Sequence, residues 1–224
     1  MPDFGFVGYG AKIGGTNNPT EKKMRLSLST ALGFLLVCGW VSAAPTACVN
    51  ATLADYIALG AQGCTLTGDV FANFSYVAGA TGGAATITAD QILVTPLLIV
   101  PAGASLNFSA PWSVDQEQTQ ESVIRYTIVP PPGGTLPSEL QLRLGPALVG
   151  GIIGGVAVHE FTNVGNLTAI IRCTEVCQEK INNSLDFDPV SVVLVTHRVR
   201  LLGGTGGASL DGFGAALDRC PLCV

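Results

Sequence analysis

Short runs in which apolar and polar residues alternate fill the chain from residue 70 onward, and this period of two constrains the fold more than any other feature. The first run covers residues 70–78 and is followed by a glycine-rich turn sequence and a second run at 84–88. Alternation of this kind predicts half-buried β-strands, and clusters of Gly, Pro and Asn predict the turns between them. Further strands are expected at 92–100, 105–110, 122–129, 139–144, 156–161, 167–173 and 190–202.

The composition agrees with an all-β domain. Charged residues make up 12% of the chain, glycine occurs 28 times, and the β-branched residues fall in short runs. Residues 44–224 are numerous enough to bury a core, and the proline-rich segment 130–134 separates no part that could stand alone. We therefore expect a single antiparallel β-sandwich, of the jelly-roll or Ig-like kind, with one or two short helices.

Two short helices are expected. Thr52 is followed three residues later by Asp55, which is a capping-box pattern. A helix should therefore run over residues 52–59 and end at Gly60. A second helix is expected at 210–217.

Two glycine-rich segments resemble a membrane-spanning segment and a phosphate-binding loop, but neither meets the requirements of these structures. The uncharged segment 145–158 is too short to span a membrane, and it is expected to form a buried strand and a turn. The segment 203–207 lacks the lysine of a phosphate-binding loop, and it is expected to be a connecting loop.

Residues 24–43 have the parts of a secretory signal peptide in the usual order: basic residues around Arg25, an uncharged apolar stretch, and small residues at the end. Cleavage is expected near Ala43, which predicts a secreted protein, extracellular or periplasmic. A membrane-spanning helix needs ~20 apolar residues, about twice the length of this stretch. Residues 1–23 are polar and glycine-rich, and they are expected to be disordered or to lie upstream of a true start at Met24.

Six cysteines remain after such cleavage, and an even number in a chain bound for an oxidising compartment predicts disulfides. Cys48 and Cys64 bracket the first expected helix, and a bridge between them would contribute roughly 3 kcal/mol. Bridges that cross between the two remaining pairs would stabilise more than local bridges, and we favour them. The alternative is a zinc site made by the same four thiolates. These two pairs are Cys173 with Cys177 and Cys220 with Cys223.

Charge and motifs exclude several functions. The chain after Ala43 carries seven basic and fourteen acidic residues, and its formal charge of −7 argues against nucleic-acid binding. The motifs of serine hydrolases and zinc proteases are absent from the sequence. His159 and His197 are expected on the outer faces of strands. Trp112 is expected in the core, and it is the candidate aromatic for contact with a ligand if it is exposed.

Several phrases of the chain point to a known class: TLADYI at 52–57 with GCT at 63–65, FANFSY at 71–76, APWSV at 110–114, ESVIRY at 121–126 and GGTGGASL at 203–210. With these phrases the chain resembles the ectodomain of bacterial secreted proteins of the PEP-CTERM sorting-domain class. The resemblance implies a β-rich body, association with exopolysaccharide and biofilm matrix, and no catalytic residue or cofactor. The segment 218–224 departs from the class because it lacks the C-terminal PEP anchor, so no permanent membrane anchor is expected.

The expected function is that of a non-enzymatic, secreted β-sandwich protein associated with the extracellular matrix, with exopolysaccharide among its partners. A polysaccharide-binding module is the first alternative and an undetected hydrolase the second. A row of exposed aromatic side chains around Trp112 would favour the module. A cleft that joins His159 or His197 to an acidic residue and to Ser or Thr would favour the hydrolase.

Overall fold

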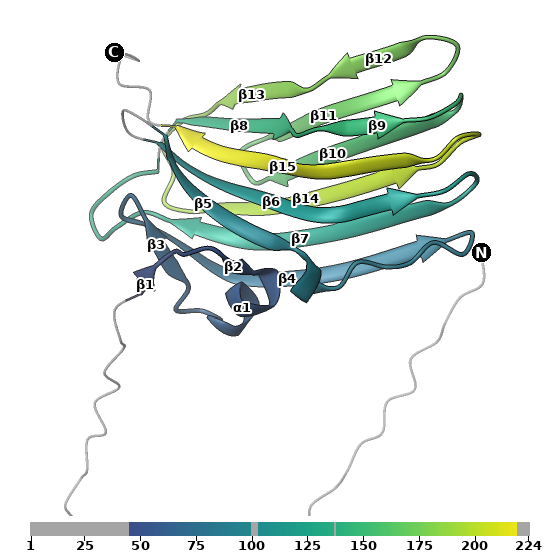
Figure 1. Cartoon of the computed structure of the whole chain (residues 1–224). Helices are drawn as coiled ribbons and strands as arrows, with labels where there is room; N and C mark the ends of the chain where they lie inside the picture. Colours follow the sequence, from purple (N-terminus) through teal and green to yellow (C-terminus); the bar gives the residue numbers. More distant parts are fainter. Residues whose placement is uncertain (1–44, 100–102, 137, 219–224) are drawn as a thin grey trace, which may run out of the picture. The chain divides into compact units, whose positions relative to one another are not determined.

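Two β-sheets lie face to face and form a β-sandwich, so the expected fold class is confirmed (Figure 1). The structure is a computed structural model and describes residues 45–99, 103–136 and 138–218. Its described residues belong to one compact unit, Ser42–Val224. The expected signal peptide and the upstream segment 1–23 lie outside the described residues. None of the helices formed by the described residues is long and apolar enough to cross a membrane.

The first sheet has eight strands in the order β1-β3-β4-β7-β14-β10-β11-β12. Its strands pair antiparallel, except that β1 and β3 run parallel. In this order the strands are Thr46–Ala47, Cys64–Leu66, Asp69–Thr81, Thr119–Val129, Val193–Leu202, Gly154–Thr162, Asn166–Cys173 and Cys177–Lys180.

The second sheet has seven strands: six in the order β13-β8-β15-β6-β5-β2, and β9, which pairs with β15. All of its pairings are antiparallel. The strands are β13 Asn182–Asp186, β8 Glu139–Leu144, β15 Ala208–Asp218, β6 Gly103–Val114, β5 Leu93–Ile99, β2 Ala51–Thr52 and β9 Ala147–Val149.

The core lies between the sheets and buries Trp112. Strand β6 continues past the expected end at residue 110, and Trp112 shares its inward face with Phe108. The side chain of Trp112 is 1% exposed, and its Nε1 donates a hydrogen bond to Oγ of Ser122, 3.1 Å away. Trp112 is therefore a core residue, and the interpretation that it contacts a ligand at the surface is wrong.

The second helix expected at 210–217 is also wrong, because these residues belong to strand β15. Leu210 and Phe213 are three residues apart, a spacing that favours a helix in the sequence. A register shift between Leu210 and Gly212 inserts a bulge, so that both side chains face the core together with Leu217.

The run at 84–88 does not form a strand either. It is followed by a short 3₁₀-helix, η1, at Ala89–Gln91. The backbone oxygen of Ala85 accepts a hydrogen bond from Nε2 of Gln120, 2.6 Å away. The side chain of Gln120 on strand β7 therefore binds the backbone of this segment, which was expected to form a strand.

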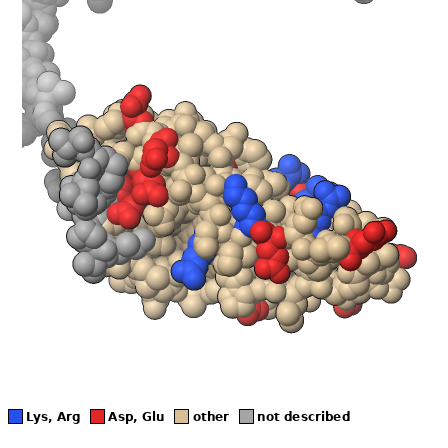
Figure 2. All heavy atoms as spheres, turned by 90° about the horizontal axis from the view of Figure 1, so that it is seen from above, with Lys and Arg blue, Asp and Glu red and all other residues tan. Residues whose placement is uncertain are grey.

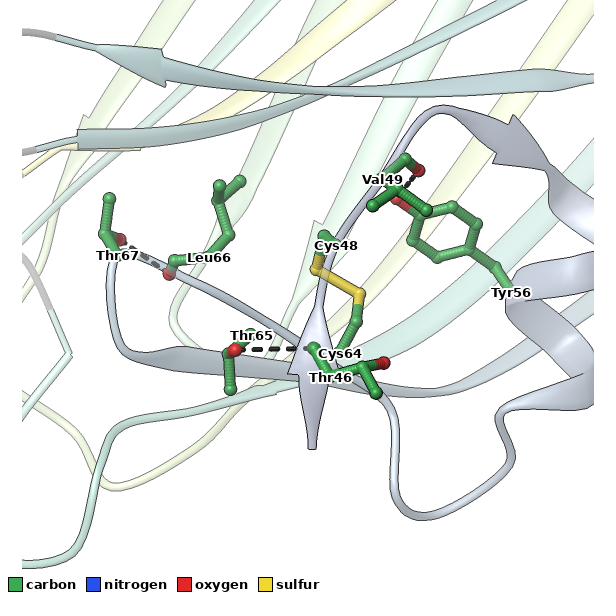
Figure 3. Close-up of a disulfide and its surroundings, with 8 residues drawn as sticks. All are labelled: Thr46, Cys48, Val49, Tyr56, Cys64, Thr65, Leu66 and Thr67. Atoms are coloured by element: carbon green, nitrogen blue, oxygen red, sulfur yellow. Dashed lines mark hydrogen bonds between the residues drawn. A yellow bond between two sulfur atoms is a disulfide. The ribbon is translucent and has the colours of Figure 1, made fainter. Parts of the chain in front are cut away.

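The expected first helix is present as α1, Leu53–Ala58. Its capping box is complete: Thr52 Oγ1 accepts from the backbone N–H of Asp55 at 3.2 Å, and Asp55 Oδ2 accepts from that of Thr52 at 3.0 Å. The hydroxyl of Thr52 also donates to Asp55 Oδ2 at 2.7 Å, and this bond, followed by that from the backbone N–H of Thr52, lowers the pKa of the Asp55 carboxyl. The expected bridge between Cys48 and Cys64 is confirmed (Figure 3).

The second disulfide joins Cys173 to Cys177, so the expected crossed pairing is wrong. Cys173 ends β11 and Cys177 begins β12, and the register of this hairpin places them directly opposite each other, with Cα atoms 4.0 Å apart. The bridge also removes two of the four thiolates that the zinc alternative requires. Cys220 and Cys223 lie outside the described residues.

Candidate functional site

The buried polar cluster of the core consists of Tyr126, Glu160 and His197, which come from three neighbouring strands of the eight-stranded sheet. The hydroxyl of Tyr126 lies 2.9 Å from Nε2 of His197, and Nδ1 of His197 lies 3.5 Å from Oε2 of Glu160. His197 is fully buried and Glu160 is 1% exposed. The expectation that His197 lies on an outer face is therefore wrong.

Burial decides the charge states of this cluster. It raises the pKa of Glu160 to about 8 and lowers that of His197 to about 3. It also raises the pKa of Tyr126 well above its usual value, and the nearby Glu160 acts in the same direction. Burial therefore favours the uncharged form of all three groups, because a buried charge loses its hydration.

This cluster is a poor candidate for an active site, although it joins a histidine to an acidic residue. Phe108 and Phe213 of the opposite sheet pack against the ring of His197, with ring centroids 5.5 and 5.0 Å away. The cluster therefore lies between the sheets, closed to a dissolved substrate. The alternation of β14 signals this position, since His197 shares its face with Val195 and Val199.

The outer face of the eight-stranded sheet has a different character. Strand β10 points Gly155, Ala157, His159 and Phe161 outward, because Val156, Val158 and Glu160 face the core. We call these four outward residues the β10 strip. At about 3.3 Å per residue, the strip extends over about 20 Å.

One end of the β10 strip carries an exposed aromatic ring. Phe161 is 43% exposed, and no other Phe, Tyr or Trp within the described ranges is as open to solvent. The ring of His159 stacks beside it, with centroids 6.1 Å apart. His159 Nδ1 also lies 3.1 Å from Oγ1 of Thr168 on β11. The expected outer-face position of His159 agrees with the structure.

The other end of the β10 strip is hollowed. A hollow of about 310 Å³ lies there, at the lower end of the size of ligand pockets in proteins. Gly155 and Ala157 provide little side chain, whereas Arg172 and Arg200 are long and stand on the two neighbouring strands. The lining includes Ile153, Gly155, Ala157, Ile170, Arg172 and Arg200.

Positive charge gathers on this face. Of the six Lys and Arg residues that the structure describes, five have cross-strand partners on the outer side of the eight-stranded sheet; they are Arg125, Arg172, Lys180, Arg198 and Arg200. Among the described strands of the eight-stranded sheet, Glu121 is the one acidic side chain on the outer face, and it forms an ion pair with Arg198 at 2.7 Å. Burial, followed by Arg198 and Arg200, lowers the pKa of His159.

The seven-stranded sheet offers three hollows around Arg143, of about 550, 690 and 230 Å³. Their polar lining includes Asn107 and Gln141, but no exposed aromatic side chain. The view from above shows charged groups of both signs on a mostly uncharged surface, with a basic and an acidic group side by side near its centre (Figure 2). Within the described residues, no group of three or more His, Cys, Asp or Glu side chains is placed to hold a metal ion.

Comparison with known proteins leaves the molecular function open. No family model and no curated protein matches the chain. Among solved structures, TmCBM61 in complex with β-1,4-galactotriose has a TM-score of 0.31 at 12% identity, over 64% of this chain and 88% of that one.

Two further structures overlap with smaller parts of their own chains. The enzymatically active domain of bacteriophage CBA120 tailspike protein 4 has a TM-score of 0.29 at 15% identity, over 62% of this chain and 19% of that one. A family two carbohydrate esterase from Cellvibrio japonicus has a TM-score of 0.21 at 14% identity, over 65% of this chain and 35% of that one. Similarity this low says nothing about the ligand or activity of the present chain.

Proposed function

We propose that the protein is an exported, non-enzymatic β-sandwich that binds polysaccharide along the β10 strip. The observation that carries the proposal is the combination of an exposed Phe161 at one end of the β10 strip with the hollow at its other end. An aromatic ring offers an apolar face on which a sugar ring can stack. The hollow supplies space where another sugar of the same polysaccharide can lie between side chains that donate hydrogen bonds.

The histidines support binding rather than hydrolysis. His197 meets an acidic group only in the closed core, and His159 contacts Thr168 without an acidic partner among the described residues. A hydrolase needs a general acid or base within reach of its substrate. The disulfides support the proposed export, since such bonds persist in oxidising compartments.

The test is glycan binding by the exported protein. We expect it to be retained by an immobilised polysaccharide, and we expect Phe161→Ala to weaken retention at least about tenfold, or ~1.4 kcal/mol. Leu148→Ala is the matched control, because Leu148 is 76% exposed and lies on the other sheet. A folded Phe161→Ala protein that binds as well as the unmodified protein would contradict the proposal, as would a panel of glycans without any binder.

A further inference from the structure

The arginines around the β10 strip indicate which class of glycan the surface binds. We infer that the strip selects an anionic polysaccharide, one whose sugars bear carboxylate or sulfate groups. The inference rests on the proposed function, because it names the class of glycan that the same surface takes.

Arg172 and Arg200 stand on either side of the strip. Arg172 on β11 lies opposite Gly155, and Arg200 on β14 lies opposite Ala157. Both border the hollow, and neither forms an ion pair with any residue that the structure describes. A planar guanidinium binds a carboxylate or sulfate group with paired hydrogen bonds, which neutral sugars cannot match.

The distribution of charge supports an anionic ligand on this face alone. The described residues include fourteen Asp and Glu against six Lys and Arg, yet five of those six cations lie around the strip. One of the five, Arg198, is already neutralised by Glu121. Four cations without an ion pair among the described residues therefore remain around the strip, which is about 20 Å long, and they can bind the anionic groups of a ligand.

A polysaccharide fits this surface better than a nucleic acid does. Duplex DNA carries one charge per ~1.7 Å and binds proteins that present many phosphate contacts. Here the cations are few, and the protein as a whole is negatively charged, with a formal charge of −5. A polysaccharide with one charge per sugar has a lower charge density, and its rings can stack on Phe161.

The test compares glycans that differ in charge. Binding of polygalacturonate, dextran sulfate and neutral galactan is measured at low and high salt, with duplex DNA as a further ligand. We expect one or both anionic glycans to bind at least tenfold more tightly than galactan at low salt, and we expect this preference to fall as salt rises. The two anionic glycans distinguish carboxylate from sulfate recognition.

Variants link the preference to the residues. Arg172→Gln with Arg200→Gln should reduce anionic-glycan binding at least tenfold more than it reduces galactan binding. Arg143→Gln, on the opposite sheet, is the matched control and should change neither. Thermal unfolding and near-ultraviolet circular dichroism of each variant show whether it is folded; if the double variant unfolds, each single arginine variant replaces it.

Equal binding of galactan and the anionic glycans would overturn this inference while the proposed function stood. Absence of binding to every glycan would contradict both. Tighter binding of DNA than of any glycan would overturn the choice of an anionic polysaccharide as the ligand. An equal loss of anionic-glycan binding with Arg143→Gln would overturn the assignment to this surface.

Discussion

Trp112 shows how a single residue can define the inside of the molecule. Its ring packs 6.0 Å from that of Phe213, centroid to centroid, and its Nε1 hydrogen bond to Ser122 satisfies the one polar atom of the indole. A large aromatic side chain can be buried at low cost only when that group has a partner. The bond joins β6 of one sheet to β7 of the other.

Trp112→Ala should lower the free energy of unfolding by about 3–5 kcal/mol, because it leaves a large cavity in the core. Trp112→Phe should cost less, since it keeps an aromatic ring and loses mainly the hydrogen bond. Denaturant unfolding measures both, with the exposed Leu148→Ala expected to stay within about 0.5 kcal/mol. A loss below about 1 kcal/mol for Trp112→Ala would contradict burial of the ring.

Glu160 and His197 make stability depend on pH. Folding raises the pKa of Glu160 from 4.5 to about 8, so the unfolded chain releases this proton more readily and stability falls as pH rises between these values. Folding lowers the pKa of His197 from 6.5 to about 3, so stability rises with pH over that range. The two slopes oppose each other between pH 4.5 and 6.5.

The expected profile for this pair is a plateau near pH 4.5–6.5 with a decline on both sides. Glu160→Gln should remove the decline between pH 6.5 and 8, because glutamine does not titrate. Denaturant unfolding of both proteins at a series of pH values measures this difference. An unchanged slope in a folded Glu160→Gln protein would show that Glu160 is not the group responsible.

At the scale of elements, the segment between β1 and β3 is held by one helix and one bridge. The Cys48–Cys64 disulfide lies beside α1, and the hydroxyl of Tyr56 on this helix donates to the backbone oxygen of Val49, 2.8 Å away (Figure 3). Tyr56 also packs its ring against Phe74 of β4. The bridge and the ring together connect the helix with the sheet.

The two disulfides should differ in their effect on stability. In the chain-entropy model, the bridge that closes the longer loop contributes roughly 3 kcal/mol, and the bridge across the β11–β12 hairpin roughly 2 kcal/mol. Cys48→Ala with Cys64→Ala should therefore destabilise the protein more than Cys173→Ala with Cys177→Ala. Denaturant unfolding of the two double variants provides the comparison, and the reverse order would contradict the prediction.

At the scale of the whole molecule, the two outer faces have different charge. Cations border the β10 strip, whereas the other sheet has Arg143 among acidic residues such as Glu139 and Asp218. This separation exists only in the folded state, because Arg172 and Arg200 are far apart along the chain. The net charge by itself argues against any anionic partner and misses a local basic surface.

Export is a property of the whole chain and stays a prediction. We expect the exported protein to begin at Ala44, with the described cysteines oxidised. Mass spectrometry of the secreted protein, with thiols alkylated before and after reduction, checks both points at once. An N-terminus upstream of Arg25 would contradict the cleavage, and free thiols at Cys48 and Cys64 would contradict the bridge.

Local patterns in the sequence determined the sandwich class, the capped helix at Thr52 and most strands, because period-two burial and helix capping depend on neighbouring residues. Tertiary structure decided the bulge that turns Leu210 and Phe213 inward together, and the partner that bridges Cys173. It also brought Arg172 and Arg200 to the two sides of β10. Strand register and sheet order set these contacts, and both depend on residues distant in the chain.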